Sequence, residues 1–116
     1  MKHQEDNMQI AFFKAASIVF PHIPEKLLHH SPNGGKRNAT EAARFRQMGV
    51  RAGFPDVILL LPGNGFNCLC MEFKTEKGKQ TAEQKEFQEQ AEAAGNKYVI
   101  VRSVEQAIDA IKNYLK

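Results

Sequence analysis

Residues 53–74, GFPDVILLLPGNGFNCLCMEFK, contain the pattern on which the prediction of the fold rests. Two apolar runs flank the turn at residues 62–65, PGNG, an arrangement typical of an antiparallel hairpin. A hairpin centred on Asn64 pairs residues whose numbers add up to about 128, so Asp56 is expected opposite Glu72, since 128 − 56 = 72. Two carboxylates would then face each other across the two strands.

The alternation of side chains along the second strand adds a lysine to this pair. Glu72 and Lys74 share one face, whereas Met71 and Phe73 lie on the other. Two readings stay open from the spacing alone. The cluster with Asp56 is either a salt bridge at a strand end or, because two close carboxylates repel each other, a site for a hard cation such as Mg²⁺.

Periodicity and capping signals predict the remaining elements. Asn38, Thr81 and Ser103 are the expected helix caps, and the apolar stripes of the first and third helices are expected to include Val19 and Ala94 respectively. Helices are expected at about residues 5–20, 38–48, 81–95 and 103–115, and strands at 57–61 and 98–101, the first of them covered on both faces. The order strand, helix, strand after the hairpin is a βαβ crossover, so residues 98–101 should run parallel to the strand bearing Glu72. The expected fold class is α/β, with a mixed central sheet that contains the hairpin and the crossover and is flanked by helices.

Two alternatives concern single helical residues. Gln84 is the fourth residue of the capping signature T-x-x-Q and lies one turn before Phe87, so it can cap its own helix or face the hairpin carboxylates. Glu5 lies in the first turn of the first helix, where a carboxylate either faces a site or only interacts with the helix dipole.

Length and composition are those of a globular domain. A chain of 116 residues with 42% hydrophobic and 25% charged residues is expected to form one domain, 1–116. Its longest apolar stretch is far shorter than the roughly 20 residues of a membrane span, and its first residues are polar, which predicts a cytoplasmic protein without a membrane partner. Cys68 and Cys70 are expected to be reduced and buried.

Positive charge is concentrated before the hairpin. Residues 36–51 hold five Lys or Arg and one Glu, hence +5 − 1 = +4, and the rest of the chain sums to −1. This segment either binds phosphates or is a solvated helix face. Arg44 and Arg46 are two residues apart in a helix, so only one of them is expected to point at a ligand.

The combination of these features resembles a known family. Pro55-Asp56 followed by Glu72-Phe73-Lys74 resembles the PD-(D/E)XK nuclease motif, and the chain as a whole resembles the small stand-alone form of the VRR-NUC (virus-type replication-repair nuclease) family. The bare motif is short, so the further residues make the resemblance specific. These are Glu5, Gln9, Asn33-Gly34-Gly35-Lys36-Arg37, Gly53-Phe54, Gln84 and Ala94-Gly95.

The resemblance implies a restriction-endonuclease-like core and a set of roles. Asp56 and Glu72 would bind Mg²⁺ or Mn²⁺ together with the backbone carbonyl of Phe73, and Lys74 would orient or activate the attacking water. Glu5 would support the metal site, and Gln84 would hold the site together or touch the substrate.

The expected function is that of a metal-dependent, structure-selective DNA endonuclease that hydrolyses phosphodiester bonds, with branched DNA such as four-way junctions as substrate and a C2 homodimer as the acting form. A bacterial or phage-encoded setting follows only from the family. The candidate DNA contacts are Asn33, Lys36, Arg37, Arg44, Arg46, Lys77 and Lys79. The competing functions are a non-cleaving nucleic-acid-binding module on a nuclease scaffold, and an exonuclease or restriction-type nuclease.

Overall fold

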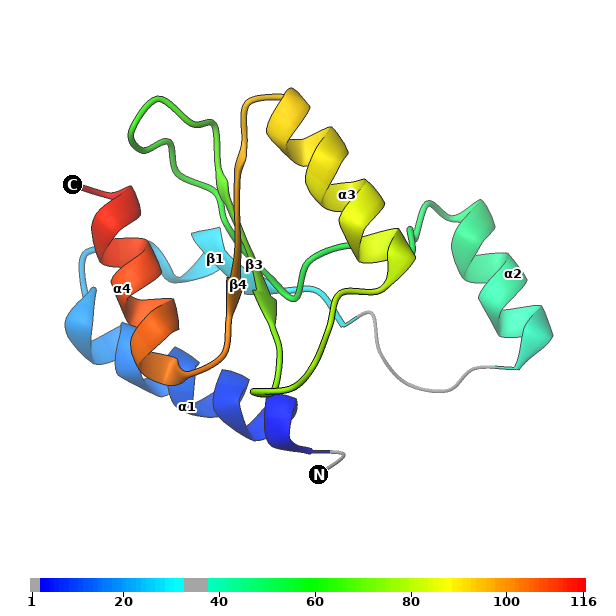
Figure 1. The fold of residues 1–116 in the computed structure, drawn as a ribbon, viewed down its shortest axis with the longest axis horizontal. Helices are drawn as coiled ribbons and strands as arrows, with labels where there is room; N and C mark the ends of the chain where they lie inside the picture. Colours follow the sequence, from blue (N-terminus) through cyan, green and yellow to red (C-terminus); the bar gives the residue numbers. More distant parts are fainter. Residues whose placement is uncertain (1–2, 33–37) are drawn as a thin grey trace.

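The computed structural model of the chain describes residues 3–32 and 38–116. Its elements follow one another along the sequence as shown in Figure 1. They are α1 (Gln4–Val19), the short 3₁₀ helix η1 (Glu25–Leu27), β1 (Leu28–His30), α2 (Ala39–Gln47), β2 (Val57–Leu59), β3 (Leu69–Phe73), α3 (Ala82–Ala93), β4 (Lys97–Val101) and α4 (Val104–Tyr114).

The four strands form one mixed sheet in the order β1-β2-β3-β4. β2 pairs antiparallel with both β1 and β3, and β3 pairs parallel with β4, as the crossover predicted. Val57 lies opposite Met71 and Leu59 opposite Leu69, so partner numbers add up to 57 + 71 = 128 and the predicted register is confirmed. Asn64 and Gly65 have φ values of 50° and 84°, the left-handed conformation that a two-residue hairpin turn requires at both positions.

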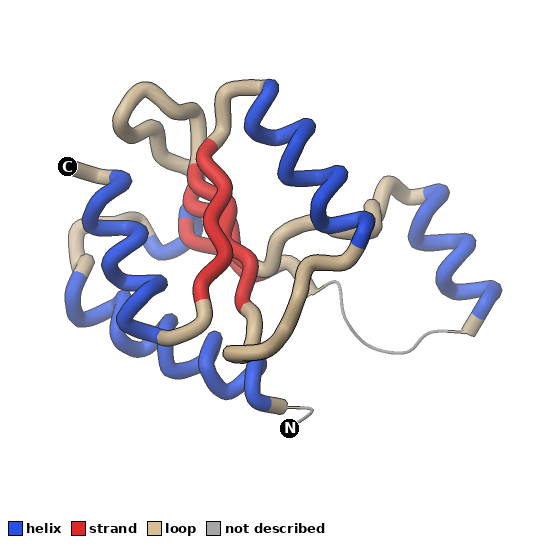
Figure 2. The backbone as a smooth tube through the Cα atoms, viewed as in Figure 1, coloured by secondary structure: helices blue, strands red, loops and turns tan. Residues whose placement is uncertain are grey.

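Helices cover the sheet unequally on its two faces. On one face α1 and α4 pack through side chains such as Phe12 and Ile111 against Leu59 and Met71, which are all fully buried. On the other face α3 lies over β4, with Ala91 buried beside the strand. Figure 2 shows the strands between these two groups of helices. The second face is thinly covered, which leaves room for polar groups at one end of β3.

α2 is the exception to this packing. None of its residues is buried, and in Figure 1 it stands out to the side of the rest of the molecule. Asn38 caps its N-terminus by accepting a hydrogen bond from the Glu41 N–H at 2.8 Å, as the sequence predicted. None of the helices in the ranges 3–32 and 38–116 is long and apolar enough to span a membrane.

Three expectations about apolar residues were wrong. β2 ends at Leu59 rather than Leu61, and Leu60 is 57% exposed, because the face opposite the core has no helix above it at this point. Val19 was expected in the apolar stripe of the first helix, but it is exposed and Phe20, just after the helix, is buried in its place. Ala94, placed on the stripe of the third helix, is exposed because the helix ends before it.

The two cysteines are free thiols, as predicted. Cys70 is buried, and burial raises the pKa of its thiol to about 12, so the group stays protonated at neutral pH. Cys68 is only half-buried and its thiol donates to the Asn96 side-chain oxygen at 3.2 Å. Cys70 is therefore not placed to act as a reactive thiolate.

Candidate active site

The hairpin register brings Asp56 to the end of the sheet beside β3. Its carboxylate Oδ2 accepts a hydrogen bond from the backbone N–H of Phe73 at 2.7 Å. The backbone carbonyl of Asp56 accepts from the Ser31 N–H at 3.0 Å and lies 2.8 Å from Nδ1 of His30, which therefore carries the hydrogen. Asp56 is thus held from both neighbouring strands, and the contribution of His30 was not foreseen from the sequence.

Glu72 is an acid buried among polar partners. Only 2% of its surface is exposed, Oε2 accepts from Gln84 Nε2 at 2.6 Å and Oε1 accepts from the Tyr98 hydroxyl at 3.2 Å. Burial first, and then the charge and hydrogen bond of Asp56, raise the pKa of Glu72 to about 8, whereas Lys74 and Tyr98 act in the opposite direction. Glu72 is therefore expected to keep its proton near neutral pH in the absence of a cation.

Gln84 fulfils both of the roles that the sequence left open. Its Oε1 accepts from the Thr81 backbone N–H at 2.9 Å, and Thr81 Oγ1 accepts from the Gln84 N–H at 3.1 Å, which completes a capping box at the start of α3. Because the cap uses Oε1, the amide nitrogen is left to face Glu72. The capping box thereby fixes the orientation of a group in the site.

Tyr98 is a site residue that the sequence did not reveal. It lies on β4 on the same side of the sheet as Glu72, 5% exposed, and its hydroxyl is also within 3.4 Å of Gln80 Nε2. The sequence predicted that the two strands are parallel but not their register. In the structure Tyr98 pairs with Cys70, two residues before Glu72 on the same face of β3.

Lys74 is buried to 92%, since 8% of its surface is exposed, and lies close enough for its charge to lower the pKa of Glu72. It makes no ion pair within 4.0 Å; in the described part of the chain the pair that meets this limit is His3 with Asp6. The hypothesis that Asp56, Glu72 and Lys74 form a salt bridge is therefore not supported. Lys74 instead supplies positive charge at short range without neutralising either acid by direct contact.

The loop that follows Lys74 is stabilised by hydrogen bonds from Arg102, the residue just after β4. Nη1 of Arg102 donates to the carbonyls of Thr75 and Gly78, both at 2.7 Å, and to that of Glu76 at 3.3 Å. The predicted phosphate contacts Lys77 and Lys79 are exposed on this loop. Arg102 was not predicted, since no local pattern links it to carbonyls more than twenty residues earlier in the chain.

A cavity of about 450 Å³ opens beside the acid pair. Asp56, Glu72, Gln84 and Glu5 all line it, so the four predicted acid and amide side chains meet at one surface. The other residues that line it are Ala42, Phe45, Arg46, Val50, Arg51, Ala52, Gly53, Phe54 and Thr81.

The predicted basic contacts differ in their relation to this cavity. Arg46 lines it, whereas Arg44 is exposed on α2 and does not. Lys74, Lys77 and Lys79 are not among the lining residues. Asn33, Lys36 and Arg37 lie outside the described residues.

The structure explains why the G-F-P-D sequence begins with a glycine. Gly53 has a φ of 84°, and a Cβ placed on it would lie 2.3 Å from the backbone oxygen of Glu83 in the first turn of α3. Next to it, the rings of Phe54 and Phe87 pack edge to face with centroids 5.1 Å apart. Segment 53–56 is therefore pressed against the same helix turn that carries Gln84.

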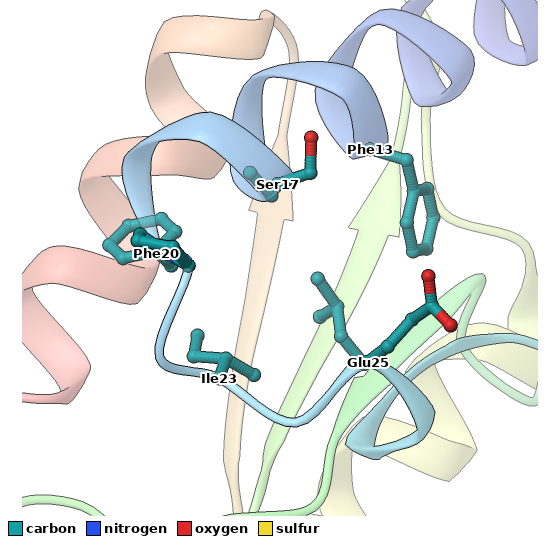
Figure 3. Close-up of a pocket in the computed structure, with 8 residues that line it drawn as sticks. Phe13, Ser17, Phe20, Ile23 and Glu25 are labelled. Carbon is teal, nitrogen blue, oxygen red and sulfur yellow. The ribbon is translucent and has the colours of Figure 1, made fainter.

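A second cavity of similar size lies between α1, η1 and β1 and is shown in Figure 3. Its walls are largely apolar, with Phe13, Phe20 and Ile23 among them, and Glu25 is the acid that lines it. Because it lacks a second acid, it does not offer the chemistry of the first cavity.

The carboxyl groups beside the first cavity are suitable ligands for a hard cation, but they would fill only part of its coordination sphere. The two facing carboxyl groups of Asp56 and Glu72 offer the oxygen ligands that Mg²⁺ takes, and Mg²⁺ commonly keeps several waters. Within residues 3–32 and 38–116, no three His, Cys, Asp or Glu side chains lie close enough together to hold a metal ion. Glu5 therefore shares the cavity without forming a third ligand with the pair.

Of the comparisons with known proteins, the one with solved structures found a similar fold. No family model and no curated protein matches the chain. A solved structure described as a VRR_NUC domain protein has a TM-score of 0.79 with this fold and 27% sequence identity, over 95% of this chain and 86% of the other.

The mixed sheet with flanking helices is an α/β fold that matches the fold of this VRR_NUC domain protein, and the match supports a nuclease-family domain in general. The structural match therefore confirms the resemblance to a stand-alone VRR-NUC domain that was found in the sequence.

Proposed function

We propose that the chain is a metal-dependent endonuclease that hydrolyses phosphodiester bonds in DNA, with branched or otherwise non-duplex DNA as its substrate. The observation that carries the proposal is the pair Asp56 and Glu72, held face to face at an open cavity with a pKa for Glu72 of about 8. A polar network of this kind at a cavity, with one strongly shifted acid, is typical of a functional site.

Asp56 and Glu72 are the residues that would hold a Mg²⁺ or Mn²⁺ ion, together with the predicted backbone carbonyl of Phe73. When bound, such an ion supplies charge neutralisation at the phosphate and activation of water. The chain's own groups do the positioning: Gln84 and Tyr98 fix the two oxygens of Glu72, and the Phe73 N–H fixes Oδ2 of Asp56.

Lys74 adds a positive charge that is already in place before substrate arrives. A buried ammonium near the acids stabilises negative charge on a phosphate or on an attacking water at no cost in reorganisation. Arg46 and Arg51 at the cavity edge supply further positive charge for a phosphate backbone.

A cleavage assay tests the proposal. Labelled duplex, single-stranded, flap and four-way-junction DNA are incubated with the protein in Mg²⁺ or in EDTA. We expect cleavage that requires the metal and is lost in Asp56→Asn and Lys74→Ala, whereas Asp109→Asn, the same change on an exposed residue of α4, leaves it intact. Cleavage unaffected by the first two changes would refute the site. Binding without any cleavage would favour a non-cleaving module, and cleavage only from DNA ends would favour an exonuclease.

The proposed acting form is a C2 homodimer, because a domain of this size offers a small footprint and a two-fold symmetric enzyme suits a two-fold symmetric junction. Sedimentation at micromolar concentration measures the oligomeric state. A fully active monomer would contradict this part of the proposal and leave the active site untouched.

A further inference from the structure

We propose that the cavity beside the acid pair binds an unstacked base of a nucleic acid strand, with the adjoining phosphate at Asp56 and Glu72. The inference rests on the proposed function, because it assigns the substrate class of the same site. The supporting evidence is the part of the cavity wall that has no role in the proposed cleavage.

That part of the wall is apolar and aromatic. Phe45 of α2, Val50 and Phe54 line the cavity that Asp56 and Glu72 also line. Neither acid needs such neighbours, since a hard cation and a phosphate are both bound by charged and polar groups. The cavity therefore joins two chemically different walls, one suited to a phosphate and one suited to a flat apolar surface.

The size of the cavity agrees with a single nucleotide unit. Its volume of about 450 Å³ falls within the range of roughly 300–1,000 Å³ that is usual for sites of small organic ligands. A duplex could not enter it, because the faces of paired bases are covered by their neighbours in the stack. A base must leave the stack before an aromatic side chain can pack on it.

Charges at the cavity fit the backbone on either side of such a base. Arg46 and Arg51 line the cavity, and Nη1 of Arg51 donates to the backbone carbonyl of Arg46 at 3.1 Å, which keeps the two basic side chains beside each other. These residues carry no opposing ion pair within 4.0 Å in the described part of the chain. Phosphates that flank the base can therefore contact them directly.

Phe45 is the best residue with which to test the proposal. It lies on α2, a helix without a buried residue, so its removal does not open the core. Met48, just after the same helix, is 70% exposed and does not line the cavity, which makes Met48→Ala a matched control for loss of an apolar side chain.

The experiment measures binding in EDTA, where the proposed cleavage cannot occur. Fluorescence anisotropy gives the affinity of the whole chain for a short single-stranded oligodeoxynucleotide and for the matched duplex. We expect Phe45→Ala to weaken single-strand binding about tenfold, as for loss of one stacked base, and to change duplex binding less than about twofold. Phe45→Tyr should restore the preference, Phe45→Leu should not, and Met48→Ala should bind as the wild type does.

Equal weakening of single-strand and duplex binding in Phe45→Ala would overturn the proposal, and so would a Phe45→Leu variant that binds single strands as the wild type does. Val50→Ala provides a second variant on the same wall, and circular dichroism checks that each variant is folded. Because binding is read without cleavage, this result and the proposed function can fail separately. A ring-dependent preference for single strands in a protein that cuts nothing would contradict only the proposed function.

Discussion

Glu72 shows how a single residue is tuned by partners from distant parts of the chain. Gln84 and Tyr98 each donate to one of its oxygens, and Asp56 opposes its negative charge. The sequence predicted Asp56 and offered Gln84 as an alternative, because both lie in recognisable local patterns. Tyr98 could not be identified in this way, since its role depends on the exact pairing of β4 with β3.

The raised pKa of Glu72 predicts a pH dependence of stability in the metal-free protein. The folded state keeps this proton up to about pH 8, whereas the unfolded chain releases it near the ordinary value of 4.5. The free energy of unfolding should therefore fall as the pH rises from 4.5 to 8, by on the order of a few kcal/mol at about 1.4 kcal/mol per pKa unit.

Glu72→Gln has no proton to lose at this position, so its stability should change less over the same pH range and exceed that of the wild type at pH 8. Urea unfolding in EDTA at several pH values measures both proteins. Identical pH profiles for wild type and variant would show that Glu72 does not carry the proton.

Removal of the Tyr98 hydroxyl should weaken the site without opening the core. Tyr98→Phe keeps the ring but removes the donor to Glu72, and loss of a group that orients a metal ligand typically costs 10–100-fold in metal affinity or activity. Metal titration and the cleavage rate measure the effect.

Tyr114→Phe is the matched control, because its hydroxyl donates to the Leu61 carbonyl at 2.6 Å far from the acids. This variant should lose about 1 kcal/mol of stability with activity unchanged. The prediction for Tyr98 fails if both variants have wild-type metal affinity or if both lose activity equally.

At the scale of elements, local sequence signals predicted the turns and helix ends, because these depend on the conformation of only a few neighbouring residues. The turn at 62–65 predicted the hairpin and its approximate register, and Asn38, Thr81 and Ser103 each cap the helix that the sequence assigned to them. The strand end at Leu59 was missed, because coverage of a strand depends on where the helices pack rather than on its own sequence.

The capping box of α3 allows the helix and the site to be tested separately. Gln84→Glu keeps an oxygen that can accept from the Thr81 N–H, but it replaces the amide donor to Glu72 with a carboxylate oxygen. We expect unchanged helix content by circular dichroism and at least a tenfold loss of cleavage. Thr81→Ala should instead lower stability by about 1 kcal/mol through loss of the cap. Equal effects of the two changes on cleavage would indicate that only the helix end matters.

At the scale of the whole molecule, the position of α2 decides which basic residues face the acid pair. Arg46 lines the cavity and Arg44 does not, a difference that the sequence predicted only as a choice between the two. The side of α2 that faces the body could not be assigned from its sequence, because the helix has no buried stripe to orient it.

This difference predicts unequal salt dependence of DNA binding. Arg46→Ala should reduce the slope of log affinity against log salt by about 1, the value for one lost phosphate contact on duplex DNA. Arg44→Ala, two residues away on the same helix, should change the slope less. Binding titrations between low and moderate salt measure both, and equal slopes for the two variants would contradict the assignment.

The bond from the Phe73 N–H to Asp56 also has a consequence for the cell. Because the side chain of Asp56 occupies a position in the pairing of the two strands, a chain folded one residue out of register would turn Glu72 to the opposite face and have no acid pair. If the chain cleaves nucleic acid as proposed, a misfolded copy would then be unable to cut it, and correct folding would itself limit unwanted cleavage.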